Sequence, residues 1–370
     1  MKLENGKISN SQLTVLIFSF LQGAAITVSF IFPLTKQGSW LAFLAGFVVS
    51  ILIFFIYTVI AQRFPGQNLV QINDIVFGRY LGKLISFLYL WFFFQLIVHN
   101  TYLLNSFWIT YIMPETPRAA FILMFTLVCA MAVWKGLEVI ARCSFLFAVT
   151  AVFTTVVITV LLIGDMKPAN LLPVIDFSAG EFFQSTFIVV TICFCEILAF
   201  LMIIPYTADK RRIRKPVMLG LFLSAIQVII VIFRGILVMG PRVLNTTSVP
   251  FASSRIIDIA EILTRLDILV AIGQLITIFM KVTIFYYVFV LSTAQILKLP
   301  SYKHLIVPIG ALSAAFAAIL YESDLEQAYS GTHTWPFYAA IYQIALPVIT
   351  LIVIALRKLP SKNNKTSLTV

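Results

Sequence analysis

Three ionisable side chains, Glu196, Arg234 and Lys281, lie inside apolar stretches of this 370-residue chain that are long enough to cross a bilayer. A charge at the centre of a membrane helix costs roughly 2.5 to 3.5 kcal/mol on insertion scales, so such residues usually face a cavity, a partner or a transported solute. Glu196 follows Phe182, at the start of its stretch, by fourteen residues, and Lys281 follows Asp267 by fourteen. Each therefore lies about 21 Å along its helix, and this matched depth allows an ion pair.

Each of the three charges has more than one interpretation. Glu196 is predicted to bind or gate a ligand, with a purely structural pairing as the alternative. The ammonium of Lys281 would either occupy the place where other transporters bind sodium, making the protein independent of that ion, or form a structural pair with Glu196 or with backbone carbonyls. Arg234 is close to the outer end of its stretch, and we expect it to extend to the membrane interface.

The elements that position these charges must be membrane helices. Hydrophobic residues make up 61% of the chain and charged residues only 11%, which excludes an ordinary soluble protein. Blocks of about 17 to 25 apolar residues match the thickness of the hydrocarbon core. We therefore predict an all-α, polytopic membrane protein with a single transmembrane domain over residues 1–370. Its ten predicted spans are 13–32, 40–61, 84–113, 119–133, 139–163, 182–205, 217–239, 268–297, 305–320 and 337–356.

Basic residues indicate the orientation of the chain. With the N-terminus inside, 18 of the 26 Lys and Arg residues fall on the cytoplasmic side, which predicts cytoplasmic N- and C-terminal tails, 1–10 and 357–370. The net charge of +11 is thus explained by topology rather than by binding of nucleic acid. The basic cluster 210–215 is interpreted as a topology anchor, or alternatively as a contact with anionic membrane lipid. The 18 residues are Lys2, Lys7, Arg63, Arg79, Lys83, Lys135, Arg142, Lys210, Arg211, Arg212, Arg214, Lys215, Lys298, Lys303, Arg357, Lys358, Lys362 and Lys365.

Spans 1 and 6 are predicted to be interrupted helices. In span 1, Gln22 is followed by the small residues Gly23, Ala24 and Ala25, which permit either close packing or local unwinding. In span 6 the charge of Glu196 requires an explanation of its own. If the domain is a 5+5 inverted repeat, with repeat one at about 11–163 and repeat two at about 182–356, the two interruptions stand in corresponding positions. Such paired interruptions indicate a substrate site near the bilayer midplane.

The predicted site is built from the two interruptions and from polar groups in other spans. The substrate-binding residues are predicted to be Gly23, Ala24, Ala25, Phe194, Cys195 and Glu196. His99 and Asn100 in span 3, and Tyr286 and Tyr287 in span 8, are candidates to line it. The sequence shows no metal-ligand cluster, nucleophile pair or phosphate-binding glycine loop, so we expect no metal, no cofactor and no enzymatic activity.

Five short motifs in order along the chain resemble the spore germination permease family, the B subunits of nutrient germinant receptors. The resemblance extends from about residue 13 to residue 356. The motifs are Arg63-Phe64-Pro65-Gly66, Pro114-Glu115-Thr116-Pro117, Asn170-Leu171-Leu172-Pro173-Val174, Phe194-Cys195-Glu196 with Phe200-Leu201-Met202-Ile203-Ile204-Pro205, and Thr264-Arg265-Leu266-Asp267.

The resemblance implies the fold of the amino acid/polyamine/organocation superfamily and a role in sensing a small nutrient, such as an amino acid, at the inner membrane of the spore. It also implies two partners, a larger membrane A subunit and a lipoprotein C subunit. A secondary amino acid transporter driven by protons or sodium is the alternative function, because it would use the same site.

Overall fold

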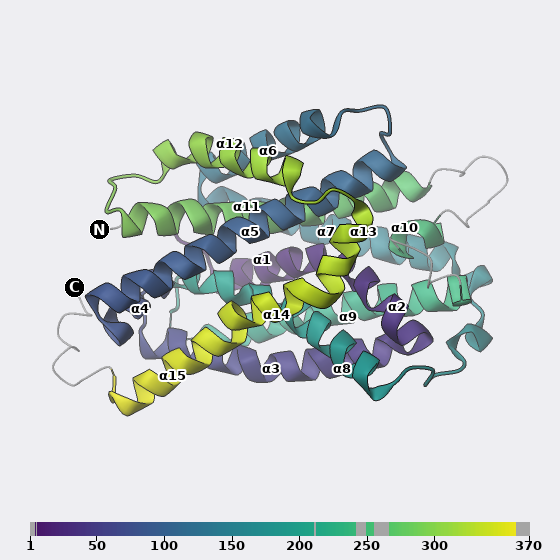
Figure 1. Ribbon diagram of the computed structural model, residues 1–370, viewed down its shortest axis with the longest axis horizontal. Helices are drawn as coiled ribbons and strands as arrows, with labels where there is room; N and C mark the ends of the chain where they lie inside the picture. Colours follow the sequence, from purple (N-terminus) through teal and green to yellow (C-terminus); the bar gives the residue numbers. More distant parts are fainter. Residues whose placement is uncertain (1–3, 5, 211, 242–248, 255–265, 360–370) are drawn as a thin grey trace.

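The structure, a computed structural model, describes residues 4, 6–210, 212–241, 249–254 and 266–359. These residues form a bundle of helices that run along one long axis (Figure 1). Parts of both predicted tails, Arg211 of the basic cluster, and Thr264 and Arg265 of the fifth motif lie outside the described residues. The principal helices are α1 (Asn10–Gln22), α2 (Phe32–Thr35), α3 (Ser39–Arg63), α4 (Leu69–Phe77), α5 (Arg79–Tyr111), α6 (Arg118–Lys135), α7 (Leu137–Leu161), α8 (Ala179–Ile188), α9 (Arg214–Met239), α10 (Val249–Ser254), α11 (Leu266–Ile296), α12 (Lys303–Ile319), α13 (Asp324–Tyr329), α14 (Trp335–Ala340) and α15 (Leu346–Leu356).

Eight helical segments of the described chain are long and apolar enough to cross a membrane. The predicted all-α, multi-pass membrane fold is therefore confirmed. The predicted spans 13–32 and 305–320 contain helices α1 and α12. These two helices have 13 and 17 residues, so each helix by itself is shorter than a full membrane crossing. The count of ten spans and the limits of the two repeats stay predictions.

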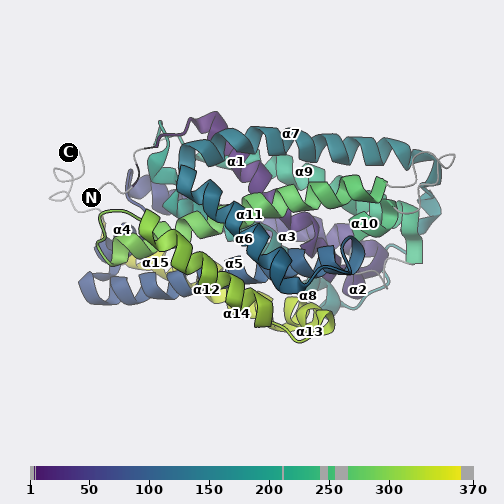
Figure 2. The same ribbon diagram turned by 90° about the horizontal axis from the view of Figure 1, so that it is seen from above.

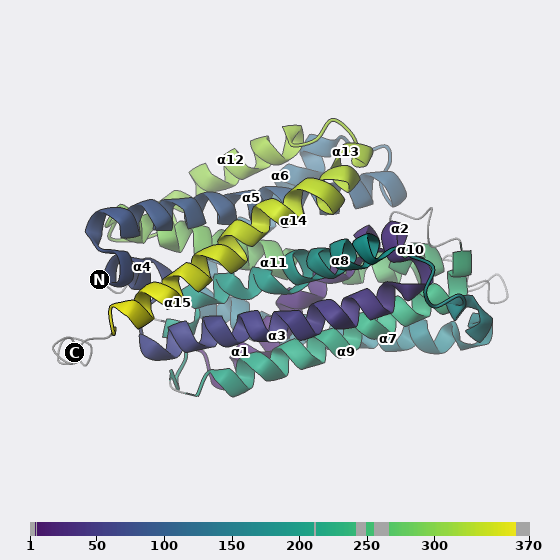
Figure 3. The ribbon, with the colours of Figure 1, turned by 60° about the horizontal axis from the view of Figure 1, so that its bottom comes forward.

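Apolar side chains on the outside of the bundle are those expected to face lipid. On α6 the exposed residues include Leu123, Leu127 and Met131, and on α7 they include Phe145 and Phe153. The turned views in Figures 2 and 3 show α7 along one edge of the bundle and α11 in its interior. Since lipid is as apolar as these side chains, their exposure to it costs little.

Span 1 is interrupted directly after Gln22, as predicted. Helix α1 gives way to a 3₁₀ turn at Gly23–Ala25 (η1) and another at Thr27–Phe30 (η2) before α2 begins. Gly23 has no room for a side chain, because an added Cβ would lie 2.8 Å from Lys281 Cδ on α11. The small residues of this segment therefore allow α11 to approach closely.

Span 6 is also interrupted, but its backbone stays helical. Helix α8 widens into a π-helical segment at Val189–Phe194 (η6), which then tightens into a 3₁₀ helix at Cys195–Met202 (η7). Cys195 has φ −71° and ψ −9°, in the right-handed region that any residue accepts. No glycine is required here, which explains why a cysteine can precede Glu196. Segments η1 and η2 both pack against η6.

The two interrupted spans are also connected outside the membrane core. Ile8, just before α1, forms a parallel bridge with Thr207, just after span 6. Its backbone N–H donates to Tyr206 O at 3.1 Å, and its carbonyl accepts from Ala208 N at 2.9 Å. Nearby, the Tyr302 hydroxyl donates to Glu4 Oε2 at 3.0 Å. Burial, followed by the Glu4 carboxylate, raises the pKa of Tyr302 and keeps this donor protonated.

Two helical segments extend well beyond their predicted spans. Helix α5 begins at Arg79, five residues before the predicted limit of 84, and continues for 33 residues from the turn at Gly78. The last helical segment begins at Asp324 rather than at 337, because α13, the π turn Ser330–Thr334 and α14 continue into one another. The α13–α15 segment crosses the bundle diagonally (Figures 1 and 3). This crossing places residues from a predicted outer loop above the interruptions of spans 1 and 6.

Candidate functional site

An ion pair joins span 6 to α11 in the middle of the bundle. Lys281 Nζ lies 2.6 Å from Glu196 Oε2, and the two side chains are only 1% and 2% exposed. Within the described chain, neither of these two atoms has a hydrogen-bond partner besides this contact. Either charge would be costly to bury alone. In the pair, the ammonium and the carboxylate neutralise each other, which lowers the cost of burying both.

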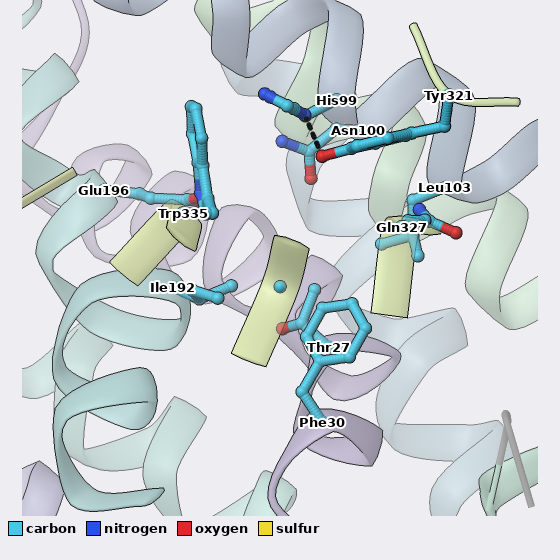
Figure 4. Close-up of a pocket in the computed structure, with 11 residues that line it drawn as sticks. Thr27, Phe30, His99, Asn100, Leu103, Ile192, Glu196, Tyr321, Gln327 and Trp335 are labelled. Atoms are coloured by element: carbon cyan, nitrogen blue, oxygen red, sulfur yellow. Dashed lines mark hydrogen bonds between the residues drawn. The ribbon is translucent and has the colours of Figure 1, made fainter. Parts of the chain in front are cut away.

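A small cavity adjoins Glu196 on the side where spans 1 and 6 meet (Figure 4). It has a volume of about 40 Å³. Four parts of the chain contribute to its wall: the interruption of span 1, the π-helical and 3₁₀ segments of span 6, the middle of α5, and the segment from Tyr321 to Trp335. The lining residues are Thr27, Phe30, His99, Asn100, Leu103, Ile192, Glu196, Tyr321, Gln327, Gly331 and Trp335.

Aromatic side chains from the α13–α14 segment cover one side of this cavity. The Trp335 ring lies 4.0 Å from that of His99, measured between centroids. The Tyr321 hydroxyl is 3.2 Å from His99 Nδ1 and donates to Ser330 Oγ at 2.9 Å. These contacts hold the segment against α5 (Figure 4). A solute larger than a few water molecules would have to displace them, given the volume of the cavity.

A direct contact between the two interruptions lies at the edge of the cavity. The Thr27 hydroxyl donates to Ala24 O at 2.8 Å, which fixes the turn of span 1. The same hydroxyl lies 3.8 Å from Cys193 Sγ in span 6. The shape of one interruption therefore depends on the side chains of the other.

Of the predicted substrate-binding residues, only Glu196 lines this cavity. Gly23 packs against the Lys281 side chain, and Ala24 is buried. Ala25 lines a second cavity on the other face of span 1. Phe194 lies 5.4 Å from Phe43 and 5.5 Å from Phe47 between ring centroids, so it packs on α3.

Cys195 also faces α3 rather than the cavity. Its carbonyl accepts a 3.5 Å hydrogen bond from the Tyr57 hydroxyl, which also bonds to the carbonyl of Gln343 in the last span. Tyr57 thereby connects the interruption of span 6 to two other helices.

His99 and Asn100 line this cavity, whereas the structure places both tyrosines of span 8 elsewhere. The Tyr286 hydroxyl donates to Ile306 O of α12, and the Tyr287 hydroxyl donates to Glu4 Oε2 at 3.1 Å. Both follow Lys281 on α11 by more than one helical turn, so they are displaced along the bundle from Glu196. Neither tyrosine lines this cavity.

The eight other lining residues were not identified from the sequence. Thr27 and Phe30 lie just beyond the small residues of span 1, so the position of the interruption was a usable signal. Leu103 and Ile192 look like ordinary apolar helix residues. The remaining four, Tyr321, Gln327, Gly331 and Trp335, come from the predicted outer loop and reach the cavity only through tertiary packing.

Arg234 does not extend to the membrane interface, contrary to expectation. Its side chain is 3% exposed and turns toward α7, where Nη1 contacts Thr155 O and Thr159 Oγ1, both at 3.4 Å. The guanidinium borders the second cavity, together with Ala25. Backbone and hydroxyl oxygens of α7 thus hold this charge inside the bundle.

The structure also bears on cysteine and metal chemistry. Cys129, Cys193 and Cys195 are buried, and Cys143 is exposed. Across the described ranges, no three His, Cys, Asp or Glu side chains come together as a metal site would require.

The comparison with known families rests on most of the chain. Residues 7–325 match the family model described as "Spore germination protein". The chain belongs to the spore germination protein family. Over 370 residues it is 25% identical to spore germination protein KB of Bacillus subtilis (strain 168), covering 98% of each chain. It is 24% identical over 232 residues to spore germination protein B2 of the same organism, covering 61% of this chain and 62% of that one.

Solved structures confirm the transporter-type fold. The nucleobase-cation-symport-1 family transporter Mhp1, in a closed conformation with bromovinylhydantoin bound, matches 97% of this chain and 81% of its own with a TM-score of 0.69. A substrate-bound, outward-open sodium-coupled sialic acid symporter matches 95% of this chain and 90% of its own with a TM-score of 0.57. Sequence identity is 13% in both cases, so the likeness concerns the fold alone. This spore germination protein is of the permease type and not an enzyme.

Proposed function

We propose that this protein is the permease-like subunit of a spore nutrient-germinant receptor, and that it binds a small nutrient in the cavity beside Glu196. One observation carries the proposal: a buried carboxylate borders a cavity at the point where two interrupted helices meet. Interrupted helices at this position form the solute sites of transporters built from inverted repeats. Family membership supports the role in germination.

The cavity wall suits a small polar nutrient with an amino group, such as an amino acid. The Glu196 carboxylate would attract an ammonium, in competition with Lys281. Asn100, Gln327 and Thr27 offer amide and hydroxyl groups, and Phe30 and Trp335 offer aromatic surface. A few polar groups on a mostly apolar wall fix the orientation of a small ligand.

Nutrient binding would have to move the segment that covers the cavity. The present volume of about 40 Å³ accommodates only a few water molecules, so Tyr321 and Trp335 must give way before an amino acid can enter. Helices α13 and α14 continue into α15, and displacement of the covering residues would therefore move the last span. We propose this movement as the signal that triggers germination.

The proposed setting is the inner membrane of the spore, with both termini cytoplasmic and with a membrane A subunit and a lipoprotein C subunit as partners. The positive-inside rule places the segments that contain Ile8 and Thr207 on the cytoplasmic side. These two residues meet at one end of the bundle. This common location places both segments on the same side of the membrane, as the proposed topology requires.

Transport of the nutrient is the second candidate function. The fold neighbours are named as a transporter and a sodium-coupled symporter, which favours it. In that case the ammonium of Lys281 would occupy the position of a coupling sodium ion, and transport would be coupled to protons instead of sodium. Uptake of labelled amino acid into proteoliposomes distinguishes transport, which accumulates label, from sensing, which does not.

The proposed binding is tested by a thermal-shift screen of the purified full-length protein against amino acids, sugars and nucleosides. We expect at least one amino acid to raise the melting temperature of the wild type, and Glu196→Gln to abolish that shift. Glu115→Gln is the matched control, because Glu115 is exposed in the turn between α5 and α6. The same shift in wild type and Glu196→Gln would remove Glu196 from the site, and no shift with any compound would contradict nutrient binding by this subunit.

A further inference from the structure

A second cavity lies on the opposite side of span 1 from the nutrient cavity, between α1, α7, α9 and α11. Its volume is about 60 Å³. Among the seven polar side chains that line it are four from three of these helices: Gln22, Thr154, Gln227 and Arg234. All four are at least nine-tenths buried. A polar cavity of this kind inside a membrane bundle requires a polar occupant.

The charge of this cavity is positive, and it has no counter-ion among the residues that the structure describes. No carboxylate in the described part of the chain lies within 4.0 Å of Arg234. Its Nη1 has only the two 3.4 Å contacts to α7, and its Nε has no hydrogen-bond partner among the described residues. A guanidinium without a counter-ion is costly to bury, so an anion in the cavity would relieve a substantial penalty.

Two further donors without a partner in the described chain face the same space. These are Gln22 Nε2, at the end of α1, and Thr154 Oγ1, on α7; neither has a hydrogen-bond partner among the described residues. With Arg234 Nε they supply three hydrogen-bond donors from three different helices. Gln227 is oriented by donating from Nε2 to Ala151 O and Thr155 Oγ1, both at 2.9 Å, and its Oε1 is without a described partner. A water molecule could serve this acceptor.

We propose that this second cavity, called the anion cavity below, binds a small monovalent anion, held by Arg234 Nε, Gln22 Nε2 and Thr154 Oγ1. Three donors, one of them charged, suit a halide or a small carboxylate. The volume admits about four water-sized groups, so chloride with one or two waters, or acetate, would fit, whereas most amino acids would not.

The anion would act on the interruption of span 1. Gln22 directly precedes Gly23, against which the Lys281 side chain packs, and Ala25, which lines the second cavity, is two residues before Thr27, which lines the nutrient cavity. Anion binding would therefore stabilise the segment that separates the two cavities. This inference does not depend on the identity of the nutrient, nor on the occurrence of transport.

The first experiment compares melting temperatures of the purified full-length protein in sodium chloride, bromide, acetate and gluconate at equal ionic strength. Gluconate is too large for the cavity and serves as the reference. We expect the wild type to melt at a higher temperature in chloride and bromide, with saturation as the concentration rises. Stabilisation by acetate as well would identify a carboxylate as an alternative source of the anion. Equal melting temperatures in all four salts would overturn the proposal.

Substitutions identify the residues that hold the anion. Arg234→Gln should lose the chloride dependence, and Arg212→Gln should retain it, because the Arg212 side chain is 88% exposed. Unchanged chloride dependence in Arg234→Gln would overturn the proposal.

A milder variant keeps the test valid if Arg234→Gln does not fold. Thr154→Val removes one donor, and should raise the chloride concentration for half-maximal stabilisation about tenfold. Thr150→Val, one turn away on the same helix, is the control. Crystals grown in bromide should show an anomalous peak within hydrogen-bond distance of Arg234. A cavity without such a peak at saturating bromide would contradict the assignment.

Discussion

The side chain of Lys281 fills the space that the missing side chain of Gly23 leaves open. A Cβ added at Gly23 would lie 2.8 Å from Lys281 Cδ and 3.2 Å from Thr277 O. From there the lysine continues to Glu196, 2.6 Å from its ammonium. One side chain thus contacts the interruptions of both span 1 and span 6, and the geometry of the nutrient cavity depends on its position.

Gly23→Ala should displace Lys281 and weaken the nutrient response. The added methyl group overlaps the lysine side chain, which is buried and has little room to move, and overpacking of this kind costs about 1 to 3 kcal/mol. The response of spores to graded nutrient concentrations measures the effect. Gly164→Ala is the matched control, because a Cβ there meets no atom within 4 Å. Equal responses in both variants would show that the contact is unimportant.

The ion pair predicts a specific pattern in single and double substitutions. Glu196→Gln or Lys281→Met alone should destabilise the purified protein by about 3 to 5 kcal/mol, because each leaves one buried charge unpaired. The double variant should recover much of that stability, since no charge remains. Thermal unfolding of all four proteins measures the coupling. Additive losses in the double variant would argue against a coupled pair. Nutrient binding should stay absent in the double variant, because the carboxylate is gone.

Filling the nutrient cavity should abolish binding without unfolding the protein. Leu103→Trp would place a larger side chain in a space of about 40 Å³ lined by Leu103 itself. Leu123→Trp makes the same change at a side chain that is 58% exposed on the lipid-facing side of α6. We expect the first variant to lose the ligand-induced rise in melting temperature and the second to keep it. Retention of the ligand shift by Leu103→Trp would place the ligand elsewhere.

The hydroxyl of Tyr57 is expected to stabilise the interruption of span 6. Tyr57→Phe removes the single hydroxyl proton that the carbonyls of Gln343 and Cys195 share, and should cost about 1 to 3 kcal/mol because these buried acceptors lose their donor. Tyr80→Phe, at a side chain that is 87% exposed, should have no measurable effect. Melting temperatures of the two variants give the comparison, and equal values would show that the hydroxyl is dispensable.

Membrane insertion physics made part of the site predictable. A buried carboxylate and a buried ammonium at equal depth had to be explained, and counting residues from the ends of their spans was enough to suggest that they could meet. Small residues at the end of α1 likewise pointed to the interruption. These inferences needed only helix rise and the cost of buried charge.

The rest of the site depends on packing between distant segments. Tyr321 and Trp335 belong to a stretch of mixed polarity that resembles an outer loop, and only the diagonal course of α13–α15 brings it over Glu196. Tyr286 and Tyr287 do not line this cavity, because they follow Lys281 on α11 by more than one helical turn. Arg234 was misassigned because the oxygen atoms of α7 that receive it cannot be recognised from α9 alone.

The short bridge between Ile8 and Thr207 restricts how the two interrupted helices can move. Its two backbone hydrogen bonds join the entry to span 1 with the exit of span 6. Any tilt of one of these ends must carry the other with it, or break both bonds at about 1 kcal/mol each. A conformational change in this protein would therefore move the N-terminal end of span 1 and the C-terminal end of span 6 together, with the two interruptions as the points of bending.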